Sequence, residues 1–211
     1  MNTSTLLMQL NQLDDHHIKQ LQPSFNRLPG TSHADGGFRL RRYSIVHVFD
    51  GGVEKLPPRP FMQTSDINEF QGDVARTFED IEPETVQTPG FHAMCRTFRD
   101  LYQLSDDNDI EIHQIRIQAD NQSVQVAPEG VHQDGFDHIA IVSIGRDNID
   151  GGDFQVFRHK TSAPLFNLPL MPGEMAALDD RALWHYAEPI TPVNHAQSGT
   201  MDVFVLTATR K

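Results

Sequence analysis

From residue 110 to the end of the sequence, the chain is a series of short apolar segments interrupted by glycine, proline and aspartate. The segments are rich in β-branched and aromatic residues, and several alternate apolar with polar positions, as a half-buried strand does. They read IEIHQIRIQ, HIAIVSIG, GGDFQVF, GEMAALDD, RALWHYAEPI and MDVFVLTAT. Strands at this spacing predict an antiparallel sandwich or barrel in this half of the chain.

The first half of the chain has a different pattern, which predicts helices and one strand. The expected elements are helices at residues 6–21, 66–81 and 88–104, a loop at 30–37 and a strand at 38–50. The helices are expected because apolar residues recur at three- and four-residue steps, and Thr88 and Pro89 suit the start of the third helix. We therefore expect one α+β domain over residues 1–211, in which a mainly helical part (1–109) packs on a β core (110–211).

Charge and cysteine content argue against several partners and compartments. The 211 residues carry a formal net charge of −12, which argues against binding to nucleic acid or to anionic membranes. No apolar run approaches the roughly 18 residues that a membrane helix needs, and the first residues do not resemble a secretory signal. The single cysteine, Cys95, leaves no intrachain disulfide, so we expect a soluble cytoplasmic protein.

The segment PEGVHQDG, residues 128–135, places His132 and Asp134 two positions apart. On a strand such residues point to the same side, and a strand-like segment about fifty residues later supplies His185. Two histidines and one carboxylate on one face of a metal make the facial triad of non-haem Fe(II) oxygenases. The alternative is that Asp134 and Gly135 form a turn and that His132 is an ordinary surface histidine.

The order of these motifs resembles a known family. PEGVHQDG, then RDNIDGG, then DDRALWH is similar to the Fe(II)/2-oxoglutarate dioxygenase family that includes the bacterial L-isoleucine dioxygenases and the biofilm stress-and-motility proteins. The resemblance extends over residues 38–209 and implies a double-stranded β-helix core (jelly-roll, cupin-like). It also implies that His132, Asp134 and His185 bind iron.

The same resemblance implies a reaction. 2-Oxoglutarate would bind the Fe(II) through its keto oxygen and its C1 carboxylate, and O₂ would take the last position. The reaction would hydroxylate a C–H bond of a small polar substrate, a free amino acid or a derivative, and release succinate and CO₂. A homodimer is one of the oligomeric states that the sequence leaves open.

Gln114 and Arg116 alternate with isoleucines in the segment IEIHQIRIQ. Either this polar face lines a cavity, where Arg116 could bind a carboxylate, or it is the solvated face of an edge strand. The resemblance favours the first reading, so both are candidate residues for binding 2-oxoglutarate. Of the neighbouring Arg41 and Arg42, we expect one to face inward and one to face solvent.

Turn residues surround the motif segments. Asn148 and the glycines at 151–152 suit a tight connection, because glycine tolerates positive φ. The two aspartates at 179–180 lead into the segment of His185, and one of them could orient this histidine.

One position departs from the family pattern. Members of the family carry an arginine just before the aspartate of the last strand, which favours binding of the C5 carboxylate of 2-oxoglutarate, whereas this chain has Met201. Arg116 or, less favourably, Arg210 could take over this role; otherwise 2-oxoglutarate binding is weaker or the co-substrate is a different one. Two alternatives stay open for this reason: a metal-binding, cupin-like sensor or binding module without catalysis, and a zinc hydrolase that uses the same ligands.

Overall fold

The computed structural model describes residues 7–64 and 72–211. Its helices are α1 (Asp15–Leu21), the 3₁₀ helix η1 (Gln22–Arg27), α2 (Pro83–Val86) and α3 (Pro89–Tyr102). Its strands are β1 (Met8–Gln12), β2 (Arg39–Phe49), β3 (Gly52–Lys55), β4 (Ile110–Ala119), β5 (His138–Asp147), β6 (Ile149–Gly151), β7 (Phe154–Phe157), β8 (Pro164–Leu168), β9 (Glu174–Asp179), β10 (Trp184–Ala187), β11 (Ile190–Pro192) and β12 (Gly199–Ala208). Each segment that was predicted as a strand after residue 110 contains one.

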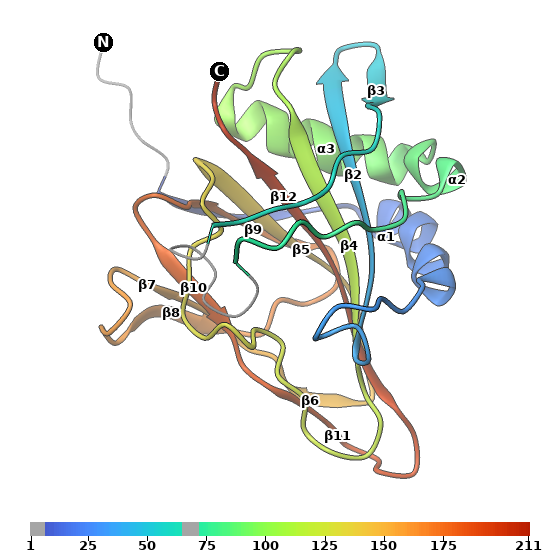
Figure 1. Cartoon of the computed structure of the whole chain (residues 1–211), viewed down its shortest axis with the longest axis vertical. Coiled ribbons are helices and arrows are strands. Elements are labelled where there is room, and N and C mark those ends of the chain that lie inside the picture. Colours follow the sequence, from blue (N-terminus) through green and yellow to red (C-terminus); the bar gives the residue numbers. More distant parts are fainter. Residues whose placement is uncertain (1–6, 65–71) are drawn as a thin grey trace.

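The strands form one large and two small antiparallel sheets. The large sheet has seven strands in the order β1-β9-β5-β12-β4-β2-β3. The small sheets, β10-β7-β8 and β11-β6, lie on one side of it, and helices α1 and α3 lie on the other (Figure 1). The predicted jelly-roll core with helices packed on it is therefore confirmed.

Strand β12 shows how the sequence divides the molecule into two apolar layers. Met201 and Val203 face the small sheets, whereas Phe204 and Leu206 face the helices. The period of two along a strand produces this division, because successive side chains point to opposite faces of the sheet. Both faces of this central strand are buried, and its sequence is accordingly apolar on both.

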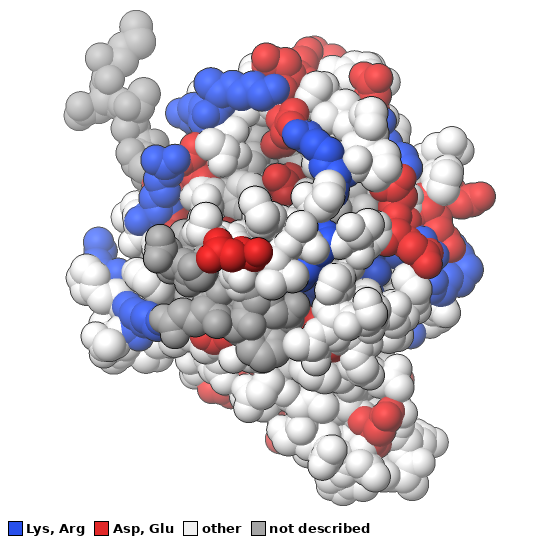
Figure 2. All heavy atoms as spheres, in the orientation of Figure 1, with Lys and Arg blue, Asp and Glu red and all other residues white. Residues whose placement is uncertain are grey.

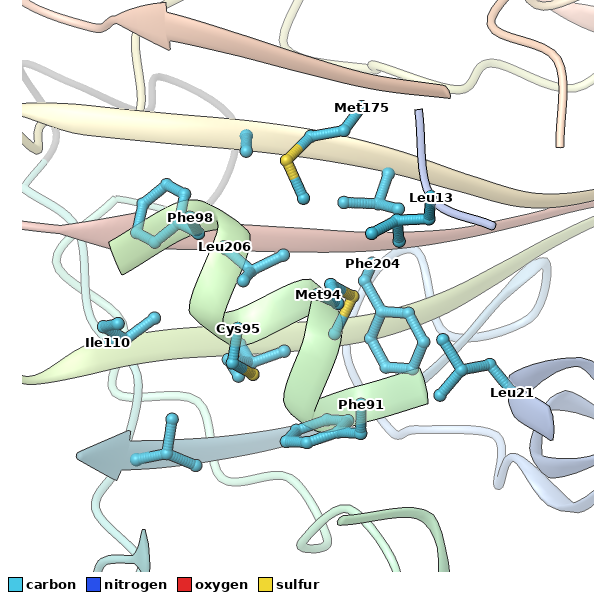
Figure 3. Close-up of a cluster of buried hydrophobic side chains, with 14 of the residues drawn as sticks. Leu13, Leu21, Phe91, Met94, Cys95, Phe98, Ile110, Met175, Phe204 and Leu206 are labelled. Atoms are coloured by element: carbon cyan, nitrogen blue, oxygen red, sulfur yellow. The ribbon is translucent and has the colours of Figure 1, made fainter. Parts of the chain in front are cut away.

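Helix α3 covers the helical side of the large sheet. Its residues Phe91, Met94 and Phe98 are fully buried and pack with Phe204 and Leu206 of β12 (Figure 3). The predicted cap is present, since the hydroxyl oxygen of Thr88 accepts a hydrogen bond from the backbone N–H of Phe91 at 3.1 Å. The third predicted helix is thus confirmed.

The first two predicted helices are wrong in part. The first is split into strand β1 and helix α1, because β1 pairs with the edge strand β9 of the large sheet. Of the second, residues 66–71 lie outside the described residues. The remainder, residues 72–81, contains no helix and joins the fold through an isolated bridge between Arg76 and Phe61. Strands β1, β2 and β3 belong to the large sheet, so residues 1–109 contribute more strands than expected.

The surface shows no separation of charge on the face seen in Figure 2. Acidic and basic side chains alternate there, and the tip formed by β6 and β11 is largely uncharged. Within the described part of the chain, no helix is long and apolar enough to cross a membrane.

Candidate metal centre

His132 and His185 are backbone partners across a short antiparallel bridge. The N–H of His132 donates to the carbonyl of His185 at 3.0 Å, and the N–H of His185 donates to that of His132 at 2.9 Å. Directly paired residues project their side chains to the same side, so the two ring centroids lie 4.3 Å apart. The structure therefore brings together the two histidines that the sequence singled out.

Asp134 completes the group. Its Oδ1 lies 3.8 Å from His132 Nε2 and its Oδ2 lies 3.6 Å from His185 Nε2. Ligand atoms that bind a metal at about 2.1 Å and at right angles are about 3 Å apart, so small side-chain rotations would close this set on one ion. The Nδ1 of His132 donates to the carbonyl of Gly130 at 2.8 Å, so Nε2 is the nitrogen that faces Asp134 and, at 3.4 Å, Glu129 Oε1.

Burial shifts the protonation of these groups. The pKa of the Asp134 carboxyl is raised by burial, and the nearby His132 offsets this only in part. The pKa of His185 is held well below its usual range by burial and by His132. A divalent cation favours the ionised carboxylate and binds neutral imidazole, so this donor set fits Fe(II).

Asp180 holds the segment that carries Asp134. Its carboxylate accepts hydrogen bonds from three consecutive backbone N–H groups, those of residues 134–136, at 3.0, 2.7 and 3.0 Å. Burial and the charge of Asp134 raise the pKa of Asp180 to about 7. Its Oδ1 lies 3.9 Å from His185 Nδ1, which is beyond hydrogen-bond distance. Asp180 therefore positions Asp134, and not the histidine that the sequence suggested.

A cavity of about 120 Å³ opens beside the three residues, between the large sheet and the small ones. Its apolar wall includes Ile115, Ile117, Ile141, Leu170 and Val203. Its charged and polar lining includes Arg39, Arg41, Gln63, Arg76 and Glu129. Such a cavity, mostly apolar with a few convergent polar groups, is typical of a site for a small molecule.

The arginines on the cavity wall carry an excess of positive charge. Arg41 is only 5% exposed, and burial together with Arg39 lowers its pKa to about 9, so it is still protonated at neutral pH. Asp35 Oδ2 lies 3.1 Å from Arg39 Nη1 and 3.6 Å from Arg41 Nη2, and Glu129 Oε2 lies 4.0 Å from Arg39 Nη1. The third carboxylate of the cavity, Asp134, belongs to the candidate metal site. Among the described residues outside that site, the guanidinium groups of Arg39, Arg41 and Arg76 therefore face two carboxylates, and one positive charge remains for a ligand.

Gln63 links this cluster to the metal ligands. Arg76 Nη2 donates to Gln63 Oε1 at 3.0 Å, and Gln63 Nε2 donates to the backbone carbonyl of Asp134 at 3.0 Å. Neither residue was predicted: Gln63 lies in an irregular segment, and the apolar spacing around Arg76 predicted a helix that the structure does not contain. Glu129 and Arg39 could have been found: Glu129 belongs to the PEGVHQDG motif, and Arg39 shares a strand face with Arg41.

The two neighbouring arginines of β2 behave as expected. Arg41 faces the cavity, whereas Arg42 points to the other side of the sheet and donates from Nη1 to Glu79 Oε2 at 2.8 Å. Arg42 also lies 3.6 Å from Glu82. The period of two along a strand explains why adjacent arginines take opposite roles.

The prediction that Gln114 and Arg116 face the cavity is wrong. The cavity face of β4 consists of His113, Ile115 and Ile117. Gln114 Nε2 donates to Ser24 Oγ on the helical side, and Arg116 makes two hydrogen bonds of 2.7 Å to the carboxylate of Asp202. The predicted alternation of this strand is present. After His113, however, the isoleucines face the cavity, and the polar residues face the helical side of the sheet.

A jelly-roll core with two histidines and a carboxylate at the mouth of a cavity defines a mononuclear metal enzyme of the non-haem iron class. A family model described as 2OG-Fe dioxygenase matches residues 22–207. The chain belongs to this family, whose enzymes depend on Fe(II) and 2-oxoglutarate. A search of the curated proteins finds no significant match.

Solved structures agree with this assignment. A bsmA homolog from Methylobium petroleophilum PM1 is 27% identical, with a TM-score of 0.78 over 92% of this chain and 81% of the other. IDO from Bacillus thuringiensis is 16% identical, with a TM-score of 0.76 over 96% and 94%. TqaL, described as an Fe(II)/α-ketoglutarate-dependent dioxygenase, is 17% identical, with a TM-score of 0.70 over 93% and 75%.

Proposed function

We propose that this enzyme hydroxylates a small substrate that carries a carboxylate, with a free amino acid as the favoured class. His132, Asp134 and His185 would hold Fe(II). The bound iron and 2-oxoglutarate supply the oxidising chemistry, and the residues of this chain bind and orient the substrate and keep water out. The observation that carries the proposal is the excess positive charge of the arginine cluster beside these three residues.

The rest of the cavity supports an amino acid. A carboxylate fits the guanidinium groups of the cluster, because Arg binds planar anions through paired hydrogen bonds. Glu129 suits an ammonium group: burial would raise its pKa, but Arg39 and His132 outweigh burial and lower it, so the carboxylate is ionised. The isoleucine-rich wall suits an aliphatic side chain.

A substrate screen tests the proposal. Protein with Fe(II), 2-oxoglutarate and O₂ is offered single amino acids and their carboxamides, and products are identified by mass spectrometry. We expect at least one amino acid to gain one oxygen atom with formation of succinate, and its carboxamide to react poorly. Consumption of 2-oxoglutarate without oxidation of any amino acid would contradict the proposed substrate class.

A pair of neighbouring arginines supplies a variant and its control. For the converted amino acid, Arg41→Met should raise KM by about 10- to 100-fold, because it removes a charged hydrogen-bond partner of the carboxylate. Arg42→Met, which changes an arginine on the opposite face of the sheet, should leave KM within a few-fold. An equal effect of both substitutions would show that the cluster does not bind the substrate.

A further inference from the structure

The family's co-substrate brings a second anionic group into the cavity. 2-Oxoglutarate has a carboxylate next to its keto group and another at C5. When the carboxylate next to the keto group binds the metal, the C5 carboxylate is buried in the cavity. It then needs a cationic partner, because burying an unpaired charge is costly. The cluster of Arg39, Arg41 and Arg76 has charge for one further anion, which the proposed function assigns to the substrate. A second cation is therefore needed.

The register of the large sheet places a further cation, the guanidinium of Arg146, in the same row of paired residues as Arg39 and Met201. Arg39 on β2 pairs with Ile117 on β4, Ile117 pairs with Met201 on β12, and Met201 pairs with Arg146 on β5. Residues paired in this way project to the same face. Arg146 is one strand away from Met201, and Arg39 is two strands away. Neighbouring strands lie about 4.8 Å apart, so Arg146 is the nearer of the two arginines along the sheet.

The side chains of Arg146 and Met201 meet beside Gly152. A Cβ atom at Gly152 would lie 3.1 Å from Met201 Sδ and 3.2 Å from Arg146 Nη1, so both side chains end next to this glycine. Gly152 has a φ of +72°, which suits glycine. Met201 lines the cavity, whereas its strand partner Arg146 is not among the residues of the cavity wall.

Arg146 has an unused donor at this place. Nη2 donates to the backbone carbonyl of Gly151 at 2.5 Å, which fixes the guanidinium. Nη1 is buried and has no hydrogen-bond partner among the described residues. Buried guanidinium N–H groups are normally satisfied, because an unmade bond to a charged donor is costly. A bound anion would satisfy it.

We infer that Arg146 supplies the cationic partner of the C5 carboxylate of 2-oxoglutarate, in place of an arginine at position 201. The inference rests on the proposed function, which assigns the cluster of Arg39, Arg41 and Arg76 to the substrate. Methionine is unbranched and flexible, so the side chain of Met201 can turn aside and let the carboxylate reach Nη1. Arg116 is excluded from this role, because it faces the helical side and is bound to Asp202.

Two ligands and two variants test the assignment. The affinity of metal-loaded protein is measured anaerobically by calorimetry for 2-oxoglutarate and for 2-oxopentanoate, which has the same chain length but no C5 carboxylate. Arg146→Met should weaken 2-oxoglutarate by about 10- to 100-fold and leave 2-oxopentanoate within a few-fold. Arg146→Lys should recover part of the loss. Arg158→Met, an exposed arginine, is the matched control and should change neither.

The double variant Arg146→Met with Met201→Arg guards against a merely structural effect. It returns an arginine to the neighbouring strand, and it should restore the affinity for 2-oxoglutarate over that of Arg146→Met alone. Equal affinity of the wild type and Arg146→Met for 2-oxoglutarate would overturn the inference, as would an equal loss for both keto acids. Failure of the amino-acid screen with an intact response to Arg146→Met would instead overturn the substrate class alone.

Discussion

At the scale of single residues, a backbone pairing creates the candidate metal site. His132 and His185 are adjacent because each bonds the other's main chain, so their rings share one side without any help from neighbouring side chains. Asp134 has no such pairing, and it depends on Asp180 for its position. The carboxylate is therefore the ligand that is most sensitive to substitutions outside the triad.

The substitution Asp180→Asn tests this dependence. Asparagine has nearly the same volume as aspartate but only one acceptor oxygen. At least one of the backbone N–H groups of residues 134–136 would therefore lose its hydrogen-bond acceptor. We expect a loss of about 1–3 kcal/mol in the free energy of unfolding of the metal-free protein, measured with urea, and a 10- to 100-fold loss in Fe(II) affinity. Asp179→Asn, whose side chain caps the adjacent turn, is the control for metal affinity. Unchanged Fe(II) affinity in Asp180→Asn would show that Asp134 does not need this support.

At the scale of elements, the sequence predicted the strands of the core better than the first helices. Alternation and turn residues were enough for the strands after residue 110, because these are local signals. Residues 8–12 carry apolar spacing compatible with a helix, but an open sheet edge at β9 determines their structure. That edge is formed by residues far along the chain, so a local pattern could not reveal it.

The sequence also could not predict which face of strand β4 lines the cavity. On β4 the alternation is clear, but both faces of the large sheet are buried, one by helices and one by the small sheets. An alternating pattern cannot say which layer its polar residues meet. Gln114 and Arg116 were assigned to the cavity for this reason. The spacing of His132 and Asp134 alone left a turn as the alternative, and the resemblance of the longer motif order to a known family is what singled out the three residues that the structure brings together.

A close contact between α1 and α3 gives a prediction for these elements. A Cβ at Gly90 would lie 2.5 Å from the carbonyl oxygen of His17, which is backbone and cannot move aside easily. Gly90→Ala should lower the free energy of unfolding by at least about 1 kcal/mol in urea denaturation, because overpacking forces the helices apart. Gly37→Ala, where a Cβ would contact nothing within 4 Å, should change it by less than about 0.5 kcal/mol. A similar stability of the two variants would contradict the close packing.

At the scale of the whole molecule, the large sheet has the main apolar core on one side and the candidate site on the other. Its helical side holds the larger apolar cluster (Figure 3). Its other side holds the cavity, the triad and the arginines. Ligands that bind in the cavity should raise the free energy of unfolding, because they bind the native state. We expect the helical layer on the other side of the sheet to be unchanged by this binding. The arginines and carboxylates that line the cavity come from β2 and from the loops, not from β12.

The central claim is that the triad binds Fe(II) and that 2-oxoglutarate binds to this metal. The most direct measurement is an anaerobic titration of the Fe(II)-loaded protein with 2-oxoglutarate, followed by visible absorption of the metal–keto-acid complex and repeated with Asp134→Ala. We expect a saturable absorption band in the wild type and none in Asp134→Ala, because the variant lacks the anionic ligand. Binding of 2-oxoglutarate without any such band, or an equal band in Asp134→Ala, would contradict the account.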